Sequence, residues 1–377
     1  MDQIRKRPDT SRDQFTDDAA HAWTLPANLY TDPDVLREET RRIFHRSWIY
    51  VAPLAVFKNP GDYTTQEIID QRIFVIRTRE GDLKAFFNVC QHRGHSLLQG
   101  SGTAHMPIVC PYHAWAYDDE GALRAAPNCH AVADFDRADF SLPEVAVDTF
   151  AGFVFVNLDP NARPMAEVYP GAEERLREFC PQIDQLKPGR EIPFDIAGNW
   201  KNVGDNLLEC YHCSVAHKAF VDLVDMSTYQ VELHDNWSLQ WGECREQNIA
   251  YDFESGVSGT NQNVTLFLWP MVAFSLFPGM QGMATFAFLP LEAERTRQVY
   301  GYHTANDTLT PTEEKALDYF GDVLGPEDVS LVEDVQRGLH SLGYHQGRFM
   351  IDAKRTSISE HAAHHFQALV ANALDLD

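Results

Sequence analysis

The sequence predicts an α+β protein: a small all-β domain, then a larger domain in which helices cover an antiparallel sheet. The chain has 377 residues, more than one hydrophobic core usually holds. Short alternating strands with turn signals run from Trp48 to about Leu158, and helices mix with aromatic strands after that. We therefore expect a helical arm at residues 1–44 that packs on the larger domain, the β domain at 45–160, and the larger domain at 161–377.

The individual elements follow from local signals. A helix is predicted at Asp32–His45, because Asp32 or Asp34 can cap an amphipathic run there. Strands are expected in the β domain at Arg72–Arg77, Leu83–Val89 and Phe153–Asn157. In the larger domain, aromatic strands are expected between residues 229 and 302, and helices at Glu173–Phe179, Trp200–His212, Pro311–Val323, Pro326–Leu339 and Ser359–Leu374.

Composition limits the possible partners. Hydrophobic residues make up 44% of the chain and charged residues 23%, which is typical of a soluble globular protein, and we expect it in the cytoplasm, without contact to a membrane. The net charge of −24 argues against nucleic acid as a partner and is compatible with a cationic small molecule. Seven cysteines without an export signal favour metal ligands and buried thiols over disulfides.

Two Cys/His pairs form the first candidate site. Cys90 and His92 are followed, after seventeen residues, by Cys110 and His113. Thiolates and imidazoles in loops suit zinc or an iron–sulfur cluster. Zinc is the simpler alternative, but each half pairs one Cys with one His, and the first half is Cys-x-His rather than Cys-x-x-Cys. That division favours a Rieske-type 2Fe-2S cluster, with both cysteines on one iron and both histidines on the other.

A second site is indicated downstream. His212 and His217 are five residues apart and cannot share one face of a regular helix, so the helix must end or bulge between them. Asp205 and Glu209 share a helical face with His212, and burying two carboxylates there would be costly without a metal. A solvated acidic face is the alternative explanation.

Asp328 is the candidate third ligand. It lies on the apolar face of the predicted helix Pro326–Leu339, whereas Glu327 points away from that face. Two histidines and one carboxylate are the ligands of many oxygen-activating Fe(II) sites. An acid in a first helical turn also complements the helix dipole, so this alternative remains open.

Together these residues resemble the α (oxygenase) subunit of the Rieske non-haem iron oxygenases. The resemblance runs from Trp48 to the C-terminal helix. Most of the family has Asp at the position of Glu209. A Glu there resembles the branch that contains carnitine monooxygenase and the glycine betaine and stachydrine demethylases. The stretch 265–283 departs from carnitine monooxygenase.

The resemblance implies a function. The chain would be the oxygenase component of a two-component system, carrying a 2Fe-2S cluster and a mononuclear Fe(II), that hydroxylates or N-demethylates a quaternary ammonium compound with O2. It would form a homotrimer and receive electrons from an NAD(P)H-dependent reductase with flavin and an iron–sulfur centre. Glu209 would link the two centres across a subunit boundary, and Asp205 is its competitor for this role.

A quaternary ammonium ion needs aromatic faces or a carboxylate around it. Candidates for these contacts, with core packing as the alternative for each, are Trp237, Trp241, Phe267 and Trp269. Two other functions remain open: an aromatic-ring-hydroxylating dioxygenase of the same architecture, and an electron-transfer protein without oxygenase activity. The second is weak, because an electron carrier needs only the β domain.

Overall fold

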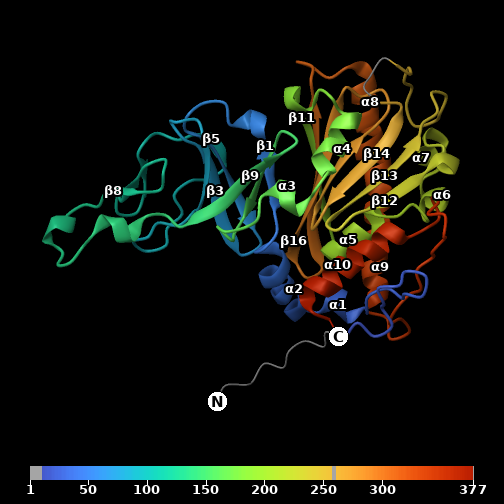
Figure 1. Cartoon of the computed structure of the whole chain (residues 1–377), viewed down its shortest axis with the longest axis horizontal. Helices are drawn as coiled ribbons and strands as arrows, with labels where there is room; N and C mark the ends of the chain where they lie inside the picture. Colours follow the sequence, from blue (N-terminus) through green and yellow to red (C-terminus); the bar gives the residue numbers. More distant parts are fainter. Residues whose placement is uncertain (1–10, 257–259, 377) are drawn as a thin grey trace. The chain divides into compact units, whose positions relative to one another are not determined.

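The computed structural model describes residues 11–256 and 260–376. The chain forms two compact units, one at Phe44–Val168 and one that combines Met1–Ile43 with Tyr169–Asp377 (Figure 1). No helix in the described part of the chain is long and apolar enough to cross a membrane.

The smaller unit is built from strands. A seven-stranded sheet has the order β1-β10-β9-β4-β3-β2-β5, and β6-β7-β8 form a separate three-stranded sheet. One short helix, α3 (Met165–Val168), closes the unit. The strands are β1 Ile49–Pro53, β2 Asp62–Ile68, β3 Gln71–Arg77, β4 Leu83–Phe87, β5 Ser101–Thr103, β6 Ile108–Val109, β7 Ala116–Tyr117, β8 Leu123–Ala125, β9 Glu144–Phe150 and β10 Phe153–Asn157.

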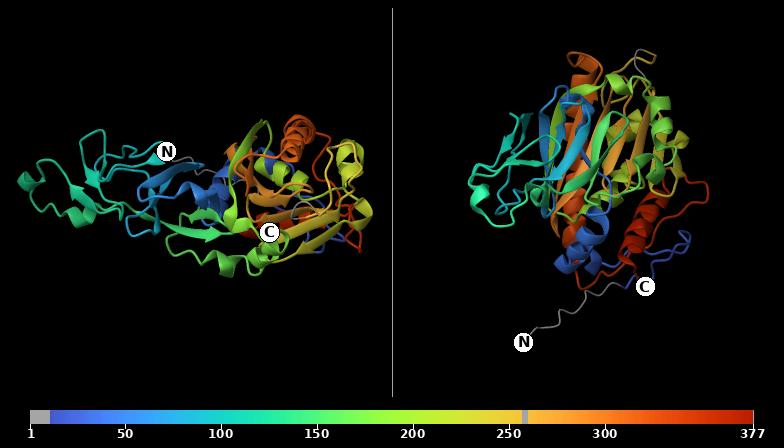
Figure 2. Two further views of the ribbon diagram at one scale, coloured as in Figure 1. Left: turned by 90° about the horizontal axis from the view of Figure 1, so that it is seen from above. Right: turned by 60° about the vertical axis from the view of Figure 1, so that its left-hand side comes forward.

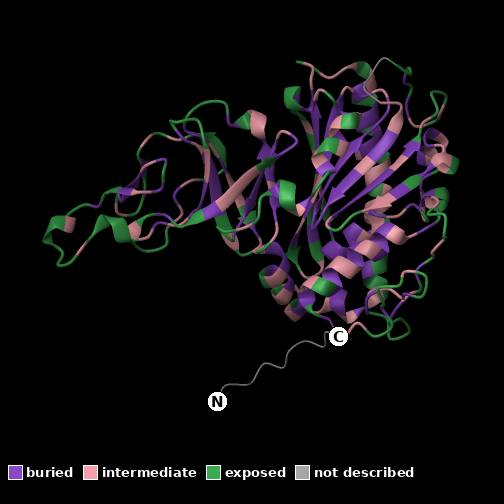
Figure 3. Cartoon of the chain, in the orientation of Figure 1, coloured by how far each residue is buried: buried purple, intermediate pink, exposed green. Residues whose placement is uncertain are grey.

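The larger unit centres on a second seven-stranded sheet, of order β11-β17-β16-β15-β14-β13-β12. All neighbouring strands in it are antiparallel. Strand β15 is buried along its whole length, and purple dominates the middle of this sheet in Figure 3. The strands are β11 Lys187–Ile196, β12 Gln230–Leu233, β13 Trp237–Glu243, β14 Gln262–Leu268, β15 Val272–Leu276, β16 Gly282–Glu292 and β17 Arg295–Thr304.

Helices lie on both faces of this sheet (Figure 2, left). On one face α5 packs against β16, α9 and α10, and on the other face α4 contacts β14. A Cβ on Gly204 of α5 would lie 2.5 Å from the Phe366 ring of α10, so these two helices pack closely. The helices are α1 Asn28–Thr31, α2 Pro33–Glu39, α4 Ala172–Phe179, α5 Trp200–Leu207, α6 Cys213–Ala216, α7 Lys218–Leu223, α8 Pro311–Tyr319, α9 Gly325–Leu339 and α10 His361–Leu374. The predicted α+β fold class is confirmed.

A buried ion pair connects the N-terminal segment to α5. Lys201 and Glu39 both have no exposed side-chain surface, and their charged groups are in contact. The Trp200 indole also donates a hydrogen bond of 2.8 Å to Glu39. Burying two charges is costly unless each is paired and hydrogen-bonded, and this pair meets both conditions.

Three local predictions were wrong. Helix α5 ends at Leu207 rather than His212, because the Glu209 carboxylate accepts hydrogen bonds from the backbone N–H groups of the next turn. Residues 311–339 form one continuous helix, in which a π-helical turn at Phe320–Leu324 joins α8 to α9. A disulfide joins Cys210 to Cys213, whose Cα atoms the tight loop after α5 brings to 4.9 Å; five other cysteines are free thiols.

Candidate metal centres and substrate cavity

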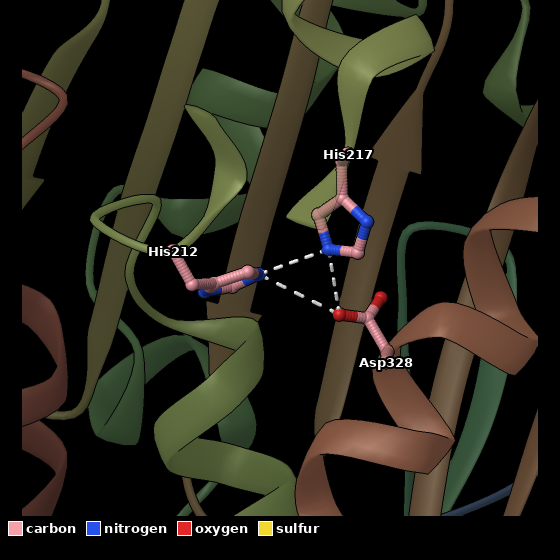
Figure 4. A group of neighbouring side chains, drawn as sticks. All are labelled: His212, His217 and Asp328. Atoms are coloured by element: carbon pink, nitrogen blue, oxygen red, sulfur yellow. Dashed lines mark hydrogen bonds and ion pairs between the residues drawn. The ribbon is translucent and has the colours of Figure 1, made fainter. Parts of the chain in front are cut away.

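His212, His217 and Asp328 converge on one point (Figure 4). The two Nε2 atoms are 3.0 Å apart, and Asp328 Oδ1 lies 2.9 Å from His217 Nε2 and 3.5 Å from His212 Nε2. Ligand atoms about 2.1 Å from a metal ion and at right angles to each other are about 3 Å apart, as one face of an octahedron requires. The three residues can therefore hold one metal ion and leave coordination positions open.

A carboxylate holds the other nitrogen of each histidine. Glu209 contacts Nδ1 of His212, and Glu327 Oε2 lies 2.7 Å from Nδ1 of His217. Such partners fix the orientation and tautomer of a ligating imidazole. Burial lowers the pKa of His212, but Asp328 and Glu209 more than offset this effect and raise it to about 10. The site is thus built to hold positive charge.

The backbone explains how the group assembles. His212 follows the end of α5, His217 lies between α6 and α7, and Asp328 is in the first turn of α9. Asp205 does not join this group, which corrects its predicted place beside His212. It remains inside α5, where its carboxylate accepts a hydrogen bond of 2.8 Å from the Tyr30 hydroxyl. Burial raises the pKa of Asp205 to about 7.

The first Cys/His site, in the smaller unit, consists of two loops with the same backbone pattern. The N–H of Cys90 donates to His95 O at 2.8 Å, and the N–H of Cys110 donates to Trp115 O at 2.8 Å. Four residues after each cysteine the backbone is left-handed, with φ of 75° at Gly94 and 57° at Ala114. Two equivalent loops therefore present one Cys and one His each.

The donor atoms of these loops fit a 2Fe-2S cluster. Both thiols are free and buried, and burial raises the pKa of Cys90. The rings of His92 and His113 are 4.6 Å apart, and Nδ1 of His113 is buried without a hydrogen-bond partner, as a ligand atom should be. Tyr117 supports the site, since its hydroxyl lies 3.4 Å from Cys90 Sγ. The His92 ring is exposed in its unit, which suits electron exchange.

A cavity of about 120 Å³ opens onto the mononuclear group. Its walls come from α5, α9, the π-helical turn and the face of the sheet that these helices cover. At about 30 Å³ per water molecule, this space corresponds to about four water molecules, and therefore to a small organic molecule. Seven aromatic residues line it: Phe194, Phe220, Tyr229, Phe277, Phe286, Tyr300 and Phe320.

The four aromatic residues predicted to bind substrate do not line this cavity. Trp237 and Trp241 lie on the opposite face of the sheet from Gln240, where the Trp237 indole donates to Pro170 O at 3.0 Å and Trp241 packs against Arg175. Phe267 and Trp269 pack against Phe366 of α10, with ring centroids 5.8 and 5.7 Å away. These contacts show that all four residues pack within the larger unit. The prediction failed because alternation along a strand does not reveal which face of the sheet lines a cavity.

Sequence reasoning also missed two supporting residues. The sequence predicted that Glu327 points away from the apolar face that carries Asp328. In the structure its carboxylate reaches His217 Nδ1. Tyr117 carried no sequence signal, because its contact with Cys90 spans 27 residues. For Glu327, the sequence offered one indication, namely that it is an acid directly next to Asp328.

Comparison with known proteins identifies both units. Residues 47–136 match the family Rieske [2Fe-2S] domain, and residues 183–376 match Ring hydroxylating alpha subunit (catalytic domain). These two families imply a 2Fe-2S cluster and a mononuclear iron, which confirms the predicted cofactors.

Relatives with this architecture are similar along nearly the whole chain. The carnitine monooxygenase oxygenase subunit of Escherichia coli (strain K12) is 41% identical over 95% of this chain and 96% of its own length. The chloroplastic choline monooxygenase of Spinacia oleracea is 28% identical over 94% of this chain and 79% of its own. The crystal structure of the quaternary ammonium Rieske monooxygenase CntA in complex with L-carnitine superposes with a TM-score of 0.84, at 40% identity, over 93% of this chain and 96% of that chain. The resemblance seen in the sequence is thus confirmed, and the chain belongs to the Rieske non-haem iron oxygenases, as an α subunit.

Proposed function

We propose that this chain is the oxygenase component of a two-component system that uses O2 and electrons from a reductase to hydroxylate or N-demethylate a quaternary ammonium compound. The observation that carries the proposal is the convergence of His212, His217 and Asp328 in the lining of an aromatic cavity. An electron carrier would need neither the convergence nor the cavity.

The proposal assigns one group to each unit. Phe44–Val168 is the Rieske domain and holds the cluster through Cys90, His92, Cys110 and His113, while the larger unit, which includes the N-terminal segment, is the catalytic domain. A mononuclear iron would be held by His212, His217 and Asp328 and would supply the chemistry that activates O2.

The chain's own residues have three tasks around this iron. Glu209 and Glu327 keep the two imidazoles oriented through their Nδ1 atoms. The aromatic residues of the cavity exclude water and offer ring faces to a cation, which a quaternary ammonium ion requires because it has no N–H group. The similarity to carnitine and choline monooxygenases supports this substrate class.

We further propose a homotrimer in which Glu209 would link the Rieske domain of one subunit to the iron-binding residues of the next. A second cavity, of about 350 Å³, reaches Glu209 and His212 from another side. Its rim includes three exposed apolar residues, Leu331, Val335 and Tyr344. Exposed apolar surface next to Glu209 suits contact with a second copy of the chain. The reductase would be NAD(P)H-dependent and carry flavin and an iron–sulfur centre.

The test of the iron site is His217→Ala. We expect this variant to lose turnover and mononuclear iron while it keeps the visible spectrum of the cluster. His340→Ala is the matched control, because His340 lies at the exposed end of α9 and contacts Glu294. Retained activity in His217→Ala would refute the assignment.

The test of the substrate class is oxygen uptake with a competent reductase and a panel of carnitine, glycine betaine, stachydrine, choline and aromatic hydrocarbons. We expect uptake with quaternary ammonium compounds, and formaldehyde wherever an N-methyl group is removed. Uptake with the aromatic compounds alone, with a cis-diol or phenol as product, would instead establish a ring-hydroxylating dioxygenase.

A further inference from the structure

The cavity at the mononuclear group has two chemically different walls. One, the aromatic wall, consists of Phe277, Phe286, Tyr300 and Phe320. Each of these rings packs against the next in the order Phe286, Tyr300, Phe320, Phe277. The centroid distances are 4.6 Å from Phe286 to Tyr300, 5.5 Å from Tyr300 to Phe320 and 4.1 Å from Phe320 to Phe277. The faces of aromatic rings attract a cation even when it carries no N–H group.

The other, the polar wall, comes from the three neighbouring strands β13, β14 and β15. Its side chains are neutral amides and hydroxyls: Gln240, Asn263, Thr265 and Ser275. In register, Leu276 faces Val264, so Phe277 of the aromatic wall lies beside Asn263 of the polar wall. The two walls therefore meet within the reach of one small molecule.

Charge separates the possible substrates. Among the described residues that line the cavity there is no Lys or Arg, and the charged groups present are the ligands of the iron site and Glu209. A carboxylate transferred from water to the β-sheet side of this cavity would find no Lys or Arg side chain as a partner, which is costly in a buried site. A neutral polar group does not carry this cost.

Hydrogen bonding points to the residue that binds such a group. In the polar wall Thr265 and Ser275 bond to each other at 3.0 Å, and Gln240 accepts from the Tyr229 hydroxyl at 2.7 Å. Asn263 differs, because its side-chain Oδ1 is buried without a partner although the residue is only 5% exposed. A buried acceptor left without a donor is unfavourable, and a ligand hydroxyl or amide N–H would satisfy it.

We propose that the cavity selects quaternary ammonium compounds whose other end is a neutral hydroxyl or amide rather than a carboxylate, and that Asn263 is the residue that makes this choice. The ammonium group lies on the aromatic wall, and the neutral end donates a hydrogen bond to Asn263 Oδ1. This inference rests on the proposed function and deepens it, since it distinguishes substrates within one class.

The experiment compares two matched pairs of ligands by isothermal titration calorimetry on the full-length chain, with cluster and iron bound and oxygen excluded. Choline is compared with glycine betaine, and carnitine amide with carnitine, so that within each pair the carboxylate is replaced by a neutral group. We expect the neutral member to bind at least about tenfold more tightly in both pairs. Carboxylates that bind equally well or better would overturn the inference and leave the proposed function intact.

A variant pair tests the residue. Asn263→Ala should weaken binding of choline and carnitine amide by about tenfold and change binding of the two carboxylates by less than about threefold. Asn261→Ala, two residues earlier on the chain and outside the cavity lining, should leave all four affinities unchanged. An unaltered preference in a folded Asn263→Ala protein would refute its role. If none of the four compounds binds, this inference fails together with the proposed function, an outcome that the oxygen-uptake panel identifies separately.

Discussion

Glu209 and Glu327, which contact the Nδ1 atoms of the two histidines, should raise the affinity of the site for metal. Their exposure predicts which of the two contributes more. Glu327, which holds His217, has 39% of its side chain exposed, whereas Glu209, which holds His212, has 13%. Solvent weakens the interaction of the more exposed acid. Partners of this kind typically change metal affinity by about 10- to 100-fold. We expect Glu327→Gln to weaken Fe(II) binding about tenfold, and Glu209→Gln to weaken it by closer to 100-fold.

The assay is competition for Fe(II) with a chelator under anaerobic conditions, with cluster absorbance recorded as a measure of intact protein. A tenfold loss corresponds to about 1.4 kcal/mol, well above the error of such a titration. Glu333→Gln is the matched control on the same helix, because the Glu333 carboxylate accepts from the Ala197 N–H at 3.0 Å instead of from a histidine. Wild-type affinity in Glu327→Gln, or an equal loss in Glu333→Gln, would refute the reasoning.

Three further predictions concern the cluster, the buried ion pair and pH. Tyr117→Phe removes the hydroxyl beside Cys90, and we expect the cluster potential, measured by voltammetry, to fall by about 20–60 mV, since a hydrogen bond of about 0.5–1.5 kcal/mol stabilises the reduced form. Glu39→Gln leaves Lys201 buried without its counter-charge, and urea unfolding should show a loss of about 3–5 kcal/mol. Burial lowers the pKa of His303 to about 3, so below about pH 6.5 this histidine is protonated in the unfolded state but stays neutral in the folded state. The free energy of unfolding should therefore be about 2 kcal/mol lower at pH 5 than above about pH 6.5. His303→Gln should remove this decrease.

Controls separate these effects from general damage. Tyr63→Phe removes a hydroxyl that donates to Gln99 O, and should leave the cluster potential unchanged. Asp195→Asn breaks an exposed pair with Arg295 and should cost less than about 1 kcal/mol. A loss in Glu39→Gln no larger than in Asp195→Asn would contradict the account of the buried pair, and an unaltered pH dependence in His303→Gln would contradict that of the histidine.

The sequence was most informative where a residue type has few possible roles. The paired Cys and His spacing predicted both cluster loops, and the short aromatic and β-branched run Phe153–Asn157 predicted strand β10 to the residue. Asp328 was recognised because an acid on an apolar helix face needs a reason to be there. The structure supplies one, since its carboxylate meets His217.

Long-range contacts could not be predicted in this way. The helix was expected to continue to His212 because nothing in the sequence reveals that the Glu209 side chain takes the N–H groups of the next turn. The aromatic strands showed the expected alternation, but which face meets α5 and which meets α4 depends on the packing of the whole unit. For this reason Trp237 was assigned to substrate, although it packs away from the cavity.

The π-helical turn at Phe320–Leu324 makes Asp328 unusually sensitive to insertions and deletions. Helix α8 is anchored at its start by a capping box at Thr310, and the helix continues without a break to Asp328. Removing one residue from the turn would rotate everything after it by about 100°, the angle between successive residues of an α-helix. The number of residues between Thr310 and Asp328 therefore sets the direction in which the Asp328 carboxylate points, and a change of one residue would turn it away from His217.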